Sequence, residues 1–169
     1  RYNTNNQFGW LDNSQIRNKL ELILGDIRDY DSVYKSMRNC SGVIHLAALI
    51  GIPYSFVSPL AYVKTNIEGT YNVLEAAKNL KIKNLIVTST SETYGSAQYM
   101  PIDEKHPINS QSPYAASKAA ADQLALSFHK SFNLPVKIIR PFNTYGPRQS
   151  SRAIIPTIIN QCLNKNNKN

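Results

Sequence analysis

The chain has 169 residues, 42% of them hydrophobic, which is enough to build a globular domain with a buried core and excludes an intrinsically disordered protein. It contains no run of about 18 apolar residues, so the sequence predicts no membrane-spanning helix. The net charge is +8, but the basic residues are scattered singly outside the Lys/Asn-rich tail at residues 164–169, which argues against a nucleic-acid-binding protein.

Apolar segments of strand length alternate with segments of helical periodicity. A polar opening at residues 1–13 is expected to be loop, with Asp12 or Asn13 capping a short helix that runs to residue 19. The following order is strand 20–24, helix 30–39, strand 42–48, loop with Pro53 and Pro59, helix 60–80, strand 84–89, helix 112–132, strand 135–140 and helix 153–163. This alternation predicts an α/β fold, a doubly wound parallel sheet of Rossmann type with helices on both faces.

Polar residues follow the predicted strands where those strands end. They are Asp26, His45, the cluster at residues 88–92 and Asn143. Ligands of open parallel sheets bind at the carboxyl ends of the strands, so these residues are expected to share one site. His45 lies inside an apolar strand without partners at metal-ligand spacing, and no metal site is predicted. The separated cysteines, Cys40 and Cys162, favour a reducing, cytoplasmic setting over a disulfide.

Tyr114 and Lys118 are four residues apart in a predicted helix, which places both side chains on one face. A neighbouring ammonium lowers the pKa of a tyrosine, and a phenolate near neutral pH can take the proton of an alcohol. The pair therefore indicates alcohol oxidation if a hydride acceptor lies nearby. The alternative is a helix-surface pair without a role.

The sequence resembles an extended short-chain dehydrogenase/reductase. Six motifs carry the resemblance, in the family's order: GDIRD at 25–29, HLAA at 45–48, NIEGT at 66–70, STSETYG at 89–95, YAASK at 114–118 and RPFNTYGP at 140–147. The family's GxxGxxG loop, which sets the cofactor pyrophosphate on a helix N-terminus, does not occur. We expect residues 1–169 to be an internal fragment of one NAD-binding domain, lacking the first βαβ unit and the C-terminal substrate portion. Such a piece is expected to fold poorly, to bind no cofactor and to be inactive by itself.

The resemblance implies a role for each matching residue. NAD would be held by Asp26 and Ile27 at the adenine, by Leu46, Ala47 and Ala48 near the phosphates and ribose, by Thr65, and by Tyr114 and Lys118. Tyr114 would be the base, and Thr90 would bind the reacting hydroxyl of the substrate. Asn143 would contact the sugar or phosphate. A homodimer through the helices near 60–80 and 112–132 is also implied.

Thr90, Ser91 and Glu92 match the acid/base position of nucleotide-sugar 4,6-dehydratases. In that reaction, C4 of the hexose is oxidised, Glu92 removes the C5 proton, water leaves from C6 with help from Ser91, and the hydride returns to C6. The implied product is the 4-keto-6-deoxy sugar. Alternatives are a nucleotide-sugar decarboxylase or 4-epimerase on the same scaffold, or a non-catalytic dinucleotide-binding protein.

Two further stretches resemble a narrower group. They are the loop at residues 50–55 and the opening at residues 1–11, which are similar to dehydratases acting on nucleotide-linked N-acetylglucosamine in legionaminic acid synthesis. The implied substrate is therefore UDP- or GDP-N-acetylglucosamine.

Overall fold

A computed structural model describes residues 8–151 and 153–165 of the chain. The first seven residues of the expected opening loop, and residues 166–169 of the tail, lie outside the described residues. The chain divides into two units, Ile23–Phe142 and a second unit formed by Arg1–Leu22 with Asn143–Asn169. The predicted sheet and almost all predicted site residues belong to the first unit.

A three-stranded parallel sheet forms the centre of the first unit, in the order β1 (Gly42–His45), β2 (Asn84–Thr88) and β3 (Val136–Ile139). Three of the four predicted strands are therefore confirmed, each shorter than expected. The fold class predicted from the alternation is correct.

Side chains alternate between the two faces of the sheet, as the pleat requires. Leu85 and Val87 of β2 are fully buried in the core, against helices and the neighbouring Val43 and Val136. Ile44, whose register partner is Ile86, faces the other way and is 64% exposed.

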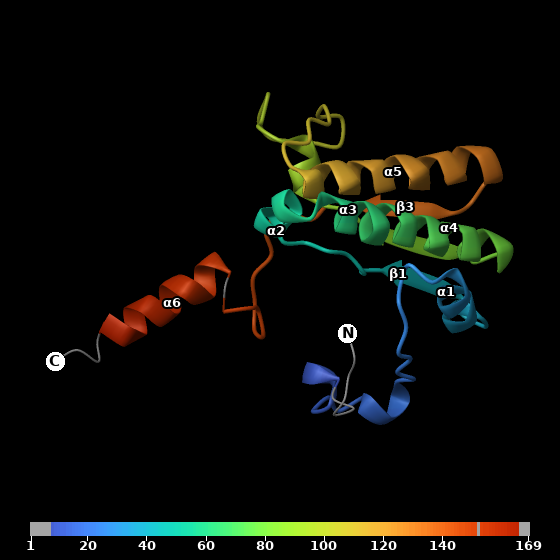
Figure 1. Cartoon of the computed structure of the whole chain (residues 1–169), viewed down its shortest axis with the longest axis horizontal. Helices are drawn as coiled ribbons and strands as arrows, with labels where there is room; N and C mark the ends of the chain where they lie inside the picture. The colour runs from blue at the N-terminus through green and yellow to red at the C-terminus, as the bar shows by residue number, and fades with distance from the viewer. Residues whose placement is uncertain (1–7, 152, 166–169) are drawn as a thin grey trace. The chain divides into compact units, whose positions relative to one another are not determined.

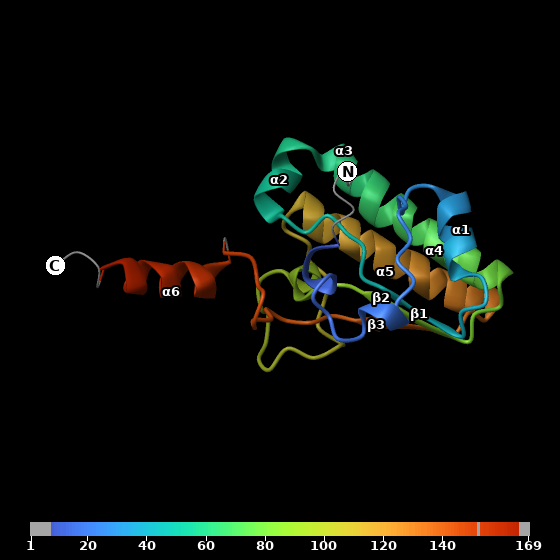
Figure 2. The ribbon, with the colours of Figure 1, turned by 90° about the horizontal axis from the view of Figure 1, so that it is seen from below.

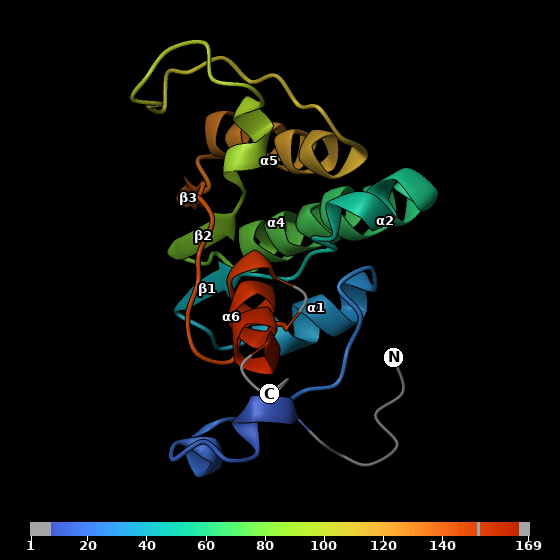
Figure 3. The ribbon, with the colours of Figure 1, turned by 90° about the vertical axis from the view of Figure 1, so that its left-hand side faces the viewer.

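Three helices, α1 (Tyr30–Met37), α4 (Gly69–Asn79) and α5 (Pro113–Phe132), cover one face of the sheet (Figures 2 and 3). The expected second helical layer is not part of this unit. Successive right-handed crossovers that step in the same direction along a sheet place their helices on the same face. The connection from β1 through α4 to β2 and the connection from β2 through α5 to β3 both run the same way across the sheet, so α4 and α5 lie on the same face (Figure 1).

The predicted helix at 60–80 is continuous but not uniform. It consists of α3 (Pro59–Tyr62), the π-helical stretch η3 (Val63–Glu68) and α4. Gly69 begins α4 where the chain after residue 24 crosses it, and a Cβ there would lie 2.9 Å from Ile27 Cγ2. The glycine therefore permits close packing between α4 and the residues that the sequence predicts at the adenine.

Three local predictions were wrong. Residues 20–24 form no strand, because among the described residues no neighbouring strand pairs with them. The loop with Pro53 instead holds α2 (Ile52–Val57), since a proline in the first turn of a helix loses no hydrogen bond. The N-terminal helix is reduced to the 3-10 turns η1 (Gly9–Leu11) and η2 (Arg17–Lys19), and neither has a side-chain cap.

The second unit contains α6 (Ile154–Lys165), which confirms the helix predicted near 153–163. None of the helices in the described ranges, 8–151 and 153–165, combines the length and apolarity needed to cross a bilayer.

Candidate active site

The carboxyl end of β2 turns directly into η4 (Ser91–Tyr94), which carries the predicted acid/base residues. Thr90 caps this turn, because its hydroxyl accepts a hydrogen bond from the Glu92 backbone N–H at 3.3 Å. The Thr93 hydroxyl donates to the Thr90 carbonyl at 2.9 Å and closes the turn from the other side. The Glu92 side chain is exposed, so its carboxylate is accessible from outside.

Tyr114 lies in the first turn of α5, which Ser112 caps through a 3.0 Å hydrogen bond from the Ala115 backbone N–H. The Tyr114 side chain is only 7% exposed, and the Thr90 side chain lies close enough to its hydroxyl to affect the pKa of the phenol. The structure thus brings together the residues that the sequence predicts to handle protons: Thr90, Glu92 and Tyr114.

The predicted lowering of the Tyr114 pKa is wrong for this chain. Burial raises the pKa of Tyr114, the hydrogen bond with Thr90 opposes that rise, and the negative charge of Glu92 adds to it. The Lys118 ammonium donates its hydrogen bond to the Thr88 carbonyl at 2.6 Å rather than to the phenol. Lys118 is itself buried, which lowers its pKa, although the charge of Asp122 works against that effect.

The loop after β1 is held by one buried amide, that of Asn66 in η3. Its oxygen accepts from the Leu49 backbone N–H at 2.8 Å, and its nitrogen donates to the Leu49 carbonyl at 3.0 Å and to Ser117 Oγ at 2.9 Å. Leu46 and Ala47 lie in this loop and are exposed, while Ala48 is half-buried. The segment predicted to face the cofactor is therefore fixed against both η3 and α5.

His45 ends β1 beneath that loop. Its Nε2 is 3.0 Å from Thr70 Oγ1, which donates in turn to the Asn66 carbonyl, so Nε2–H is the donor to Thr70. Burial, together with the charge of Lys118, lowers the pKa of His45 to about 4.

Asp26 and Ile27 lie at the end of the extended segment that packs on α4. Asp26 is exposed and forms an ion pair with Arg28, whose hydrogen bonds lower the pKa of Asp26 to about 2. Asp26 and Arg28 line a hollow of about 340 Å³ together with Asp29, Lys64 and Glu68. Of the predicted adenine contacts only Asp26 lines this hollow, and Thr65 does not line it.

A buried cluster beside the site was missed by sequence reasoning. Asp122 Oδ2 accepts hydrogen bonds from Ser89 Oγ and from Arg140 Nε, both at 2.9 Å. Arg140 Nη1 donates to the Tyr94 hydroxyl at 3.2 Å. The signal in the sequence was a lone carboxylate four residues after Lys118, on the apolar side of a helix rich in alanine.

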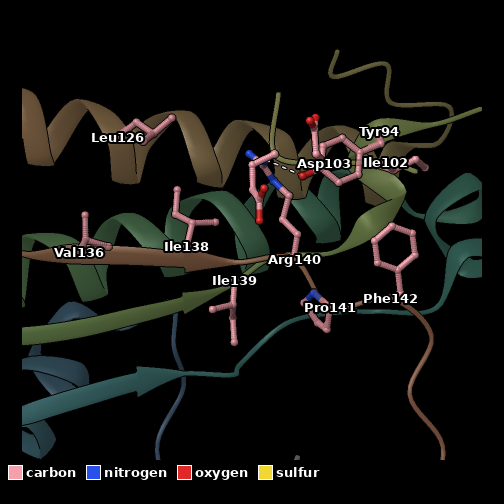
Figure 4. Close-up of a pocket in the computed structure, with 11 residues that line it drawn as sticks. Tyr94, Ile102, Asp103, Leu126, Val136, Ile138, Ile139, Arg140, Pro141 and Phe142 are labelled. Atoms are coloured by element: carbon pink, nitrogen blue, oxygen red, sulfur yellow. Dashed lines mark hydrogen bonds between the residues drawn. The ribbon is translucent and has the colours of Figure 1, made fainter. Parts of the chain in front are cut away.

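A second hollow, of about 800 Å³, lies beside β3 and is shown in Figure 4. Arg140 and Tyr94 stand at its polar end, and Val136 and Ile138 line its apolar part. None of the predicted catalytic residues lines this hollow.

Two predicted site residues, Ser91 and Asn143, are not assigned to the group formed by Thr90, Glu92 and Tyr114. Ser91 begins η4, half-buried, and its backbone N–H donates to the Pro141 carbonyl at 3.2 Å, so its hydroxyl has no assigned role. Asn143 is the first residue of the second unit, so its approach to Thr90 and Tyr114 stays a prediction.

Comparison with known proteins agrees with this geometry. The family profile described as GDP-mannose 4,6 dehydratase matches residues 1–169. The dTDP-D-glucose 4,6-dehydratase of Dictyostelium discoideum is 44% identical over 133 residues, which is 72% of this chain and 31% of that protein.

Two solved structures show the same likeness. The dTDP-glucose 4,6-dehydratase DesIV of Streptomyces venezuelae, solved with NAD, has a TM-score of 0.78 and 33% identity over 83% of this chain and 44% of its own. The UDP-N-acetylglucosamine 4-epimerase of Methanobrevibacter ruminantium has a TM-score of 0.85 and 37% identity over 90% and 50%. The chain spans about a third to a half of the length of these proteins. Because the profile covers all 169 residues, the chain belongs to the GDP-mannose 4,6-dehydratase family of extended short-chain dehydrogenases/reductases.

Proposed function

We propose that this chain carries the catalytic centre of an NAD-dependent nucleotide-sugar 4,6-dehydratase. One observation carries the proposal. Thr90 and Glu92 lie in the same turn beside Tyr114, close enough for the Thr90 side chain to oppose, and for the Glu92 charge to add to, the rise of the Tyr114 pKa that burial causes. A hydroxyl, a phenol and a free carboxylate at one strand end are the groups that oxidation at C4 and deprotonation at C5 require.

The residues fit a dinucleotide at the predicted positions. Lys118 is buried yet makes one hydrogen bond among the described residues, so two of its ammonium protons remain for ligand hydroxyls. Thr88 Oγ1, at the same strand end, is buried without a partner. When bound, NAD supplies the hydride acceptor at C4 and the hydride donor at C6, and its oxidised nicotinamide is positively charged.

Each proton transfer of the reaction is assigned to a side chain of this protein. Tyr114 takes the proton of the C4 hydroxyl, which Thr90 orients through its own hydroxyl. Because burial raises the pKa of Tyr114, that transfer depends on positive charge near the phenol. Glu92 takes the C5 proton and passes it to the departing C6 hydroxyl, with Ser91 as a second donor. When the hydride returns to C6, a proton is added at C5 and Tyr114 releases the proton that it took from O4, so the net change is the loss of one water.

The substrate we propose is a UDP- or GDP-linked N-acetylglucosamine. Support comes from the narrower sequence resemblance and from the likeness to a UDP-N-acetylglucosamine 4-epimerase. The same likeness favours 4-epimerisation as the second candidate function. An epimerase needs no carboxylate at position 92, so this residue separates the two candidates.

Product mass distinguishes the dehydratase from the 4-epimerase, because a dehydratase removes one water from the nucleotide sugar and an epimerase leaves its mass unchanged. The natural protein that contains this chain is incubated with NAD and UDP-N-acetylglucosamine, GDP-N-acetylglucosamine, dTDP-glucose or UDP-glucuronate. We expect loss of one water from an acetylglucosamine nucleotide, without net reduction of NAD, and a large loss of that activity in Glu92→Gln. Water lost only from dTDP-glucose would reassign the sugar, and carbon dioxide lost from the glucuronate would reassign the reaction.

We further propose that the active protein is a cytoplasmic homodimer that pairs through α4 and α5. Exposed apolar side chains on these helices, among them Tyr71 and Leu126, support the pairing surface. Sedimentation of the natural protein at twice the subunit mass is the expected result, and a monomer would remove this proposal.

A further inference from the structure

The buried carboxylate of Asp122 joins α5 to the ends of β2 and β3. Its side chain is 0% exposed, and a single oxygen, Oδ2, holds both Ser89 and Arg140. We propose that Asp122 is a positioning residue, which holds the turn carrying Thr90 and Glu92 in its reactive place. This inference rests on the proposed function, because it gives Asp122 a part in the same reaction.

Ser89 is the first point of attachment. Its hydroxyl donates to Asp122, and its backbone N–H donates to the Ile139 carbonyl at 2.7 Å. Thr88, the residue before it, offers the carbonyl that holds the Lys118 ammonium, and Thr90, the residue after it, lies close enough to Tyr114 to affect the pKa of that phenol. A rotation of Ser89 would therefore displace both the lysine and the threonine of the site.

Arg140 is the second point of attachment. Its guanidinium pairs with Asp122 and also donates to the Tyr94 hydroxyl, and it lies 5.2 Å from the centre of the Tyr94 ring. Figure 4 shows Arg140 reaching from the end of β3 toward Tyr94. Tyr94 is the last residue of η4, so Asp122 restrains the turn both before Thr90 and after Glu92.

The charge of Asp122 gives it a second influence. It favours the protonated form of Lys118, against the burial that lowers the pKa of that ammonium. The other titratable groups around Asp122 and Lys118 are His45 of β1, Tyr114 of α5, Tyr94 of η4 and Arg140, the residue after β3. His45 is neutral near pH 7 because its pKa is lowered to about 4, and Arg140 is a cation, so Asp122 is the anion that supports the lysine.

The test compares Asp122→Asn and Ser89→Ala with Asp31→Asn, an exposed aspartate of α1, in the natural protein. Amide exchange of the 89–94 segment is measured without substrate, and the pH dependence of kcat with NAD and the nucleotide sugar. In Asp122→Asn we expect exchange of this segment to accelerate about tenfold, kcat to fall about 100-fold with little change in KM, and the alkaline limb of kcat to move to lower pH. Ser89→Ala should accelerate the same exchange more weakly, and Asp31→Asn should match the wild type.

Each result bears on the proposal. Unchanged exchange in Asp122→Asn, or an unchanged kcat and pH profile, would overturn it. If Asp122→Asn unfolds, Ser89→Ala decides, because that variant keeps the ion pair: faster local exchange supports the proposal and unchanged exchange removes it. If the wild type dehydrates none of the sugars, the proposed function fails, and the exchange results still decide whether Asp122 positions the turn.

Discussion

Tyr114 shows how far a residue's environment can depart from what its spacing suggests. The four-residue separation from Lys118 is real, yet the ammonium is bound to the Thr88 carbonyl, and burial favours the neutral phenol. Sequence spacing fixes which face of a helix two side chains share, but not which hydrogen bond each of them makes. The roles of Tyr114 and Thr90 can therefore be tested only by removing single atoms.

Tyr114→Phe removes the phenolic oxygen and keeps the ring in place. Because the base of the C4 oxidation is lost, we expect kcat for dehydration to fall by about 10²–10⁴-fold. Tyr34→Phe in α1, a tyrosine outside the site and outside the proposed dimer surface, is the matched control and should keep full activity. A Tyr114→Phe enzyme with more than a tenth of wild-type kcat would contradict the role of the phenol.

Because His45 is buried, we expect the stability of the fold to decrease in acid. Its pKa is lowered to about 4 in the folded chain, from an ordinary 6.5, because burial disfavours the imidazolium. The unfolded chain then binds more protons between these pH values, so the free energy of unfolding falls as pH decreases from about 6.5 to about 4. The full difference corresponds to roughly 3 kcal/mol.

Urea unfolding at pH 7 and pH 5 measures this effect. His45→Gln should reduce the difference in the free energy of unfolding between pH 7 and pH 5. His129→Gln should preserve that difference, because His45 is still in place. An equally steep loss of stability in His45→Gln would assign the acid sensitivity to other groups.

At the scale of elements, hydrophobic periodicity predicted the helices and strands that local sequence determines. It failed for elements that depend on a partner elsewhere in the fold. The helices α1 and α5 and the strands β1, β2 and β3 follow from apolar spacing and from Ser112 with Pro113 at the start of α5. Residues 20–24 have the apolar character of a strand, but a strand also needs a partner, and none pairs with them in the described part of the chain. The π-helical stretch η3 was likewise invisible, since its apolar spacing is close to that of an α-helix.

Gly95 controls the exit from η4. Its φ of 65° and ψ of −143° lie in a region that residues with a Cβ avoid, and a Cβ would come within 2.1 Å of the Asn109 carbonyl oxygen. Gly95→Ala should therefore lower the free energy of unfolding by about 2 kcal/mol or more and shift the adjoining turn. Gly146→Ala, where a Cβ meets no atom within 4 Å and φ is not positive, should change stability by less than about 0.5 kcal/mol. Similar midpoints of urea unfolding for the two variants would refute this view of Gly95.

For the whole molecule, the six ordered motifs predicted where the site lies, because carboxyl ends of parallel strands meet at one edge. The structure places Thr90, Glu92 and Tyr114 near one another, and their roles in the reaction stay predictions. The motifs did not reveal Asp122 or Asn66, since a buried polar residue is recognised by its partners, and those partners are distant in sequence. Asn143 belongs to the second unit, so its contact with the sugar or phosphate stays a prediction.

The sheet itself gives the final prediction. The edge of β1 pairs with no other strand among the described residues, and Ile44 on that strand is 64% exposed. An apolar open edge invites pairing between copies of a chain, so we expect the 169-residue chain by itself to self-associate. Ile44→Lys should raise the monomer fraction at a fixed concentration, because a lysine on an edge strand opposes strand pairing. Met100→Lys removes an even more exposed apolar side chain, 85% exposed, from a loop away from the sheet, and should leave the monomer fraction unchanged. Sedimentation of the three chains distinguishes the edge from general surface apolarity: equal gains in both variants would show that the edge of β1 has no special part in association.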